Sequence, residues 1–115
     1  MEKRYSVVIT TAGSRADARE IADKVLAARL AACVQLLAIE SVYTWNGEVA
    51  NEPEILLLIK TREDLYPELE SAILAVHKYE TPEIVMLPVV GGLPAYLDWI
   101  DEVSAGGPGH LAPPG

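Results

Sequence analysis

The sequence predicts an α+β domain, a ferredoxin-like β-α-β-β-α-β sandwich with one helix added at its C-terminal end. Three observations support this prediction. Extended apolar runs and segments of helical periodicity follow one another in that order along the chain. Asn46-Gly47 joins two long β-type runs, as in a tight hairpin. Pro88 lies within the last β-type run and places it at a sheet edge, because proline cannot donate to a strand ladder.

The first strand is expected over Tyr5–Thr11, which is rich in β-branched and apolar residues. Gly13 ends it. Ser14, with Asp17 three residues later, has the pattern of a helix N-cap and an acidic first turn. Apolar residues then recur at helical spacing on one face of the predicted helix: Ala18, Ile21, Ala22, Val25, Leu26 and Leu30.

The next two strands form a hairpin that runs from Cys33 to Trp45 and returns from Glu48 to Thr61. Each arm has about a dozen residues, whereas a typical strand has about five or six. The continuous apolar run Ile55–Ile59 suggests a strand that is covered on both faces. Because a chain of 115 residues cannot cover such arms alone, we expect a homo-oligomer.

The second half of the chain is predicted to contain a helix at Glu63–Val76, an edge strand at Glu83–Val90 and a short helix that begins at Pro94. The domain is expected to occupy residues 1–104. Residues 105–115 are rich in glycine and proline without periodicity, which is typical of a disordered tail.

Charge and composition exclude several classes of protein. The chain has 9 basic and 17 acidic residues and a net charge of −8, which argues against a nucleic-acid partner. Its one cysteine, Cys33, excludes an intrachain disulfide and a cysteine-rich zinc site. We find neither an apolar run long enough for a bilayer nor a signal peptide, so we expect a cytoplasmic protein without a membrane partner.

No catalytic motif is recognisable, and we do not expect an enzyme. Both Gly-rich phosphate-binding motifs are absent. An acylphosphatase would share the predicted topology, but Thr11–Arg15 provides only a poor version of its arginine-bearing loop. Cys33, at a helix-to-strand junction, has the pattern of a small buried apolar residue.

His77 is the leading candidate metal ligand. It ends the second predicted helix, and Glu80 and Glu83 follow closely, so these residues together could bind copper, zinc or another divalent cation. The alternative is a half-exposed histidine that the dipole of the helix C-terminus favours.

Three further residues have a structural and a functional interpretation. Tyr43 and Trp45 point to the same face of a strand, where they either pack against a neighbouring surface or form a ligand platform. Lys60 either extends from a strand end into water or contacts an anion near Thr81–Glu83.

Six segments resemble the CutA divalent-cation tolerance proteins. They are VVITTAG (7–13), KVLAARLAACVQ (24–35), SVYTWNGEV (41–49), EILLLIKT (54–61), HKYETPEIVMLPV (77–89) and YLDWI (96–100), and they cover roughly residues 5–103 in the family's order. The resemblance implies a homotrimer, similar to the PII signalling proteins, in which hairpin arms and edge strands pair between subunits. It also implies a role in divalent-metal tolerance, copper included, or alternatively a small-molecule sensor.

The resemblance also implies two sets of site residues. The copper site of the family's best-known bacterial member has one cysteine and two adjacent histidines; these positions are Thr10, Val76 and His77 here, so only His77 matches. A cleft shared between subunits corresponds to five residues: Tyr43, Trp45, Lys60, Tyr79 and Glu83. An anionic metabolite held by Lys60 is the ligand expected for the sensor.

Overall fold

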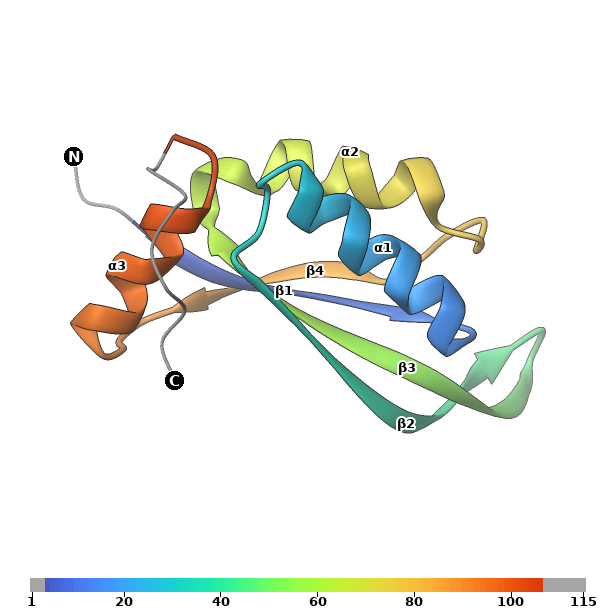
Figure 1. The fold of residues 1–115 in the computed structure, drawn as a ribbon. Helices are drawn as coiled ribbons and strands as arrows, with labels where there is room; N and C mark the ends of the chain where they lie inside the picture. Colours follow the sequence, from blue (N-terminus) through green and yellow to red (C-terminus); the bar gives the residue numbers. More distant parts are fainter. Residues whose placement is uncertain (1–3, 107–115) are drawn as a thin grey trace.

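A computed structural model describes residues 4–106 of the chain and confirms the predicted α+β arrangement (Figure 1). The elements are β1 (Tyr5–Ala12), α1 (Arg15–Ala27), β2 (Cys33–Trp45), β3 (Glu48–Arg62), a 3-10 turn η1 (Glu63–Leu65), α2 (Tyr66–Val76), β4 (Ile84–Val89) and α3 (Pro94–Val103). The sheet is antiparallel with the order β2-β3-β1-β4. The first and third strands are central, and the strand with Pro88 is an edge, as predicted.

Two features predicted from local sequence, a helix N-cap and a hairpin turn, are present in the structure. The hydroxyl of Ser14 accepts a hydrogen bond from the Asp17 N–H at 3.1 Å and caps α1. Asn46 and Gly47 both have positive φ, 52° and 79°, as a type I′ turn requires. The second predicted helix begins later than expected, since η1 precedes it. Pro67 has no N–H to donate to the Glu63 carbonyl, so the α-helical bonding pattern cannot start at Glu63.

The hydrophobic core lies between one face of the sheet and the helices α1 and α2, which lie side by side over it (Figure 1). Alternate residues of the central strands point into this core, as the period of two requires. Its largest fully buried apolar side chains are Val8, Ile21, Val25, Leu57, Ile59, Leu69 and Ile73.

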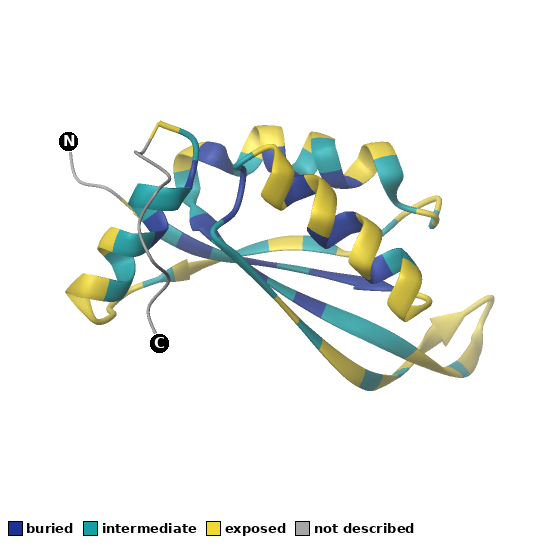
Figure 2. Cartoon of the chain, viewed as in Figure 1, coloured by how far each residue is buried: buried dark blue, intermediate teal, exposed yellow. Residues whose placement is uncertain are grey.

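The opposite face of the sheet has no helical layer over its centre (Figure 2). The strand register shows that this face is apolar. Register places the following residues on it: Val7, Ile9, Leu37, Leu56, Leu58, Val85 and Leu87. Leu37, Val85 and Leu87 are 55%, 44% and 47% exposed. The expectation that the apolar run of β3 is covered on both faces is therefore not met within one chain. We call this surface the open face.

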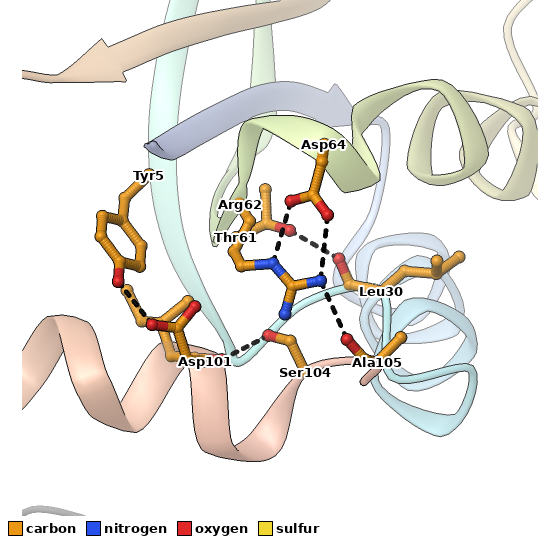
Figure 3. A network of polar contacts seen from close by, with 9 residues as sticks. Tyr5, Leu30, Thr61, Arg62, Asp64, Asp101, Ser104 and Ala105 are labelled. Atoms are coloured by element: carbon orange, nitrogen blue, oxygen red, sulfur yellow. Dashed lines mark hydrogen bonds and ion pairs between the residues drawn. The ribbon is translucent and has the colours of Figure 1, made fainter. Parts of the chain in front are cut away.

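Polar contacts fix α3 against one end of the sheet (Figure 3). The Tyr5 hydroxyl donates to Asp101 Oδ2 at 2.5 Å, and burial together with this bond raises the pKa of Tyr5 to about 12. Arg62 donates to Asp64 and, through Nη2, to the Ala105 carbonyl at 2.9 Å. Ala105, the first residue of the predicted tail, is thus bonded to the domain. Residues 107–115 of that tail lie outside the described residues.

Within residues 4–106, the structure contains no helix whose length and apolar character would allow it to cross a bilayer.

Candidate functional site

A hollow of about 760 Å³ lies where the β2–β3 hairpin extends beyond the end of β1. We call it the hairpin hollow. Its volume is within the range of about 300–1,000 Å³ that is typical of small-molecule sites. The lining residues are Thr11, Ser41, Val42, Tyr43, Trp45, Ala50, Glu52, Glu54, Tyr79, Glu80, Thr81 and Glu83.

Strand lengths and the segment between α2 and β4 bring these residues together. The last residue of β1, Ala12, pairs with Ile55, and beyond this point β2 and β3 continue as a hairpin without a third strand. The segment 77–83 then passes the end of β1. This segment passes close to Gly13, where an added Cβ atom would lie 3.3 Å from the Tyr79 hydroxyl oxygen.

Tyr79 and Glu54 form the polar base of the hollow. The Tyr79 hydroxyl donates to Glu54 Oε2 at 2.7 Å. Burial alone would raise the pKa of Glu54, but hydrogen bonds from Ser41, Tyr79 and Thr11 outweigh it, so this pKa lies below its ordinary value. Burial and the bond to Glu54 raise the pKa of Tyr79. At neutral pH the carboxylate is therefore charged and the phenol neutral.

The lining of the hairpin hollow is acidic. It contains four carboxylates, Glu52, Glu54, Glu80 and Glu83, and none of the described residues that line it is basic. Burial and the neighbouring Glu52 raise the pKa of the Tyr43 phenol, which therefore stays neutral at physiological pH. Coulombic attraction thus favours a cation in the hollow and disfavours an anion.

His77 uses both of its ring nitrogens within the chain. Its Nδ1 accepts a hydrogen bond from the Tyr79 N–H at 3.1 Å, so the imidazole proton is on Nε2. Nε2 then donates to the Thr11 carbonyl at 2.7 Å. The ring also contacts that of Tyr79, with centroids 5.0 Å apart. These contacts connect the segment 77–83 to the end of β1.

The predicted metal ligands are consequently divided. Glu80 and Glu83 line the hairpin hollow, whereas His77 is not among its lining residues. Among residues 4–106, there is no group of three or more His, Cys, Asp or Glu side chains that could hold a metal ion. His77, Glu80 and Glu83 therefore do not form a metal centre within one chain.

Of the five residues predicted to bind a ligand, the structure brings four into the hollow: Tyr43, Trp45, Tyr79 and Glu83. Lys60 lies elsewhere. It pairs with Val7 and Cys33 toward the other end of β3, and its Nζ is 5.8 Å from the centroid of the Tyr96 ring. The expectation that Lys60 lies near Thr81–Glu83 is wrong within one chain, because the strand carries it away from that segment.

Three residues of the hollow were not predicted from the sequence: Ser41, Glu52 and Glu54. The hairpin turn could have indicated the positions of these three residues. A two-residue turn at Asn46-Gly47 fixes the register, which pairs Ser41 with Glu52 and places Glu54 two residues further along the same face. Tyr43 lies on that face too, opposite Ala50.

Comparisons with known proteins agree with this architecture. Residues 6–103 match the family model described as CutA1 divalent ion tolerance protein. The divalent-cation tolerance protein CutA of Thermus thermophilus is 44% identical over 97 residues, which cover 84% of this chain and 94% of that protein. Protein CutA of Mus musculus is 41% identical over 100 residues, but this chain covers only 56% of its length.

The fold is also that of solved relatives. The crystal structure of CutA1 from Oryza sativa has a TM-score of 0.86 and 38% identity, and the match covers 90% of this chain and 95% of that chain. The structure from Thermus thermophilus has a TM-score of 0.84 and 42% identity, over 88% of this chain and 99% of that one. The chain therefore belongs to the CutA1 divalent ion tolerance protein family.

Proposed function

We propose that this protein acts in tolerance of divalent cations by binding them at the hairpin hollow of a homotrimer. The observation that carries the proposal is the acidic lining, which includes Glu80 and Glu83. Among the described residues, one chain has no group of three or more side chains that could hold a metal ion. We therefore assign the other ligands of the cation to a neighbouring subunit. The name of the relatives from Thermus thermophilus and Archaeoglobus fulgidus, divalent-cation tolerance protein CutA, supports this function.

The donor atoms determine which cation binds well. Carboxylate oxygens suit hard ions such as manganese, whereas copper and zinc favour imidazole. Since both nitrogens of His77 are hydrogen-bonded, we expect copper to bind weakly unless the ring leaves the Thr11 carbonyl. The hollow also disfavours the anionic metabolite expected through Lys60, because its lining is acidic and Lys60 lies outside it.

Calorimetric titration with Mn(II), Zn(II) and Cu(II) tests the proposal. Glu83→Gln, which removes one charge from the lining, is expected to weaken Mn(II) binding several-fold. The matched control Glu68→Gln makes the same change at an exposed position of α2 and is expected to leave binding unchanged. His77→Gln should alter Cu(II) binding only if the imidazole is a ligand. Identical isotherms for the wild type and Glu83→Gln would refute the carboxylate site.

A further inference from the structure

We propose that α3 is a C-terminal latch, a helix that opens as a unit while the sheet, α1 and α2 stay folded, and that two arginines, Arg29 and Arg62, hold it closed. This inference goes beyond the proposed function and uses no residue of the hairpin hollow. The contacts that carry it lie within one chain.

The latch has few stabilising features of its own. It is ten residues long, and isolated helices shorter than about 12–15 residues are marginal in water. No side chain caps its N-terminus at Leu93, and its last turn contains no basic residue. Asp101 and Glu102 lie near its C-terminus, where the helix dipole disfavours negative charge. The helix therefore depends on contacts with the rest of the chain.

Apolar packing holds α3 only at one point. Ile100 is its one buried residue, whereas α1 buries four: Ala18, Ile21, Ala22 and Val25. The main hydrophobic core beneath α1 and α2 contains no residue of α3. Elements with few buried apolar contacts open at a lower free energy than the core. Opening of α3 therefore leaves that core intact.

Two guanidinium groups reach the end of α3 from other elements, and we call them the clasp. Arg29, just after α1, donates through Nε to the Val103 carbonyl at 3.2 Å and through Nη2 to the Ser104 carbonyl at 2.8 Å. Arg62, the last residue of β3, donates to the Ala105 carbonyl at 2.9 Å (Figure 3). Carbonyls at the end of a helix lack partners within it, and cations there are favourable. The clasp thus supplies the C-terminal cap that α3 lacks.

The backbone of Arg29 is strained where it makes these contacts. Its φ of 56° is in the left-handed region, which is unfavourable for an L-residue and where helices commonly end in glycine. Its own carbonyl accepts a hydrogen bond from the Ala105 N–H at 2.7 Å. Glycine would remove the strain and keep this main-chain bond, but it would lose both guanidinium bonds. The clasp is therefore what an arginine adds at this position.

Native-state hydrogen exchange on the full chain, measured over a series of low urea concentrations, tests the latch. The amides of α3 should be protected at least roughly tenfold less than those of β1 and β3. Their exchange should also depend less on urea, because opening of α3 exposes little surface. If α3, β1 and β3 share one free energy of opening and one urea dependence, α3 opens only in global unfolding and the inference is overturned.

Substitutions at Arg29 test the clasp. Arg29→Met loses the guanidinium bonds and should speed exchange of the α3 amides roughly tenfold, as expected for hydrogen bonds from a charged group. Arg29→Gly loses the same bonds together with the strain, so it should give a similar increase in a less destabilised protein. The matched control Arg19→Met removes an exposed arginine of α1 that pairs with Asp23, and it should leave α3 exchange unchanged. Unchanged α3 exchange in both Arg29 variants would overturn the inference.

Light scattering on the same variants separates the latch from assembly. Their mass should equal that of the wild type, because Arg29 bonds to its own chain. A lower mass would mean that α3 exchange follows the loss of a neighbouring chain, and the inference would not stand.

Discussion

Glu54 is a carboxylate that the fold keeps charged in spite of partial burial. Three hydroxyl groups, from Thr11, Ser41 and Tyr79, compensate for the water it has lost. Its partners come from three different segments of the chain. The carboxylate therefore connects the end of β1, the outgoing arm of the hairpin and the segment before β4 at one point, and it gives the hairpin hollow a fixed negative charge.

Removal of the Tyr79 hydroxyl tests this role. Tyr79→Phe is expected to lower the free energy of unfolding at pH 7 by about 1 kcal/mol, because an ionised acceptor loses one donor. The pKa of Glu54 in the folded protein is lower than in the unfolded chain, so the stabilisation is complete above the unfolded pKa. It is lost as the pH falls through the folded pKa.

The difference between wild type and Tyr79→Phe should therefore shrink in acid. Urea unfolding at pH 7 and at a series of progressively lower pH values follows this difference as Glu54 becomes protonated. A difference that stays constant over the whole acid range would show that the ionised form of Glu54 is not what the hydroxyl stabilises.

At the scale of elements, the hairpin depends on two residues with positive φ. Gly47, at φ 79°, has open space where a Cβ would lie, so a side chain there meets no steric neighbour. Gly47→Ala is expected to lower the free energy of unfolding by about 1 kcal/mol, because an L-residue is strained in this region of φ. Denaturant unfolding at fixed protein concentration measures the change.

Gly91→Ala is the matched control for this prediction. Gly91 also has no heavy atom within 4 Å of an added Cβ, and its φ lies outside the positive range. We expect its effect to be small. Equal losses in the two variants would mean that the strain at the turn is not the cause.

Most element bounds could be predicted from the sequence because they depend on local chemistry. The N-cap at Ser14, the turn at Asn46-Gly47 and the edge position of Pro88 each follow from residues close in the chain. The predicted start of the second helix was less accurate. The cause of the difference is also local, because Pro67 forces a 3-10 turn ahead of the α-helix.

At the scale of the whole molecule, the main feature is the open face, an apolar surface that has no covering layer within one chain. Apolar side chains such as Leu37, Val85 and Leu87 are about half exposed in a single chain. Contiguous apolar surface of this kind marks interaction sites. It supports the proposal of a homotrimer, in which neighbouring chains would cover the open face and the arms of the hairpin.

Light scattering tests the assembly. The wild type is expected at the mass of three chains of 12.4 kDa, about 37 kDa. Leu87→Glu, on the open face, should lower the mass. Leu74→Glu introduces the same charge on the outer surface of α2, where the leucine is 52% exposed, and should leave it unchanged. A monomer mass for the wild type would refute the trimer.

The sequence by itself determined the order of strands and helices, the hairpin register and the acidic character, because these depend on periodicity, turn chemistry and composition. Only the tertiary structure decided which polar side chains meet. Tyr79 bonds to Glu54 across 25 residues, and His77 to Thr11 across 66. Lys60, by contrast, lies toward the other end of β3 and does not line the hollow. Such contacts depend on how distant segments pack, which short-range patterns do not specify.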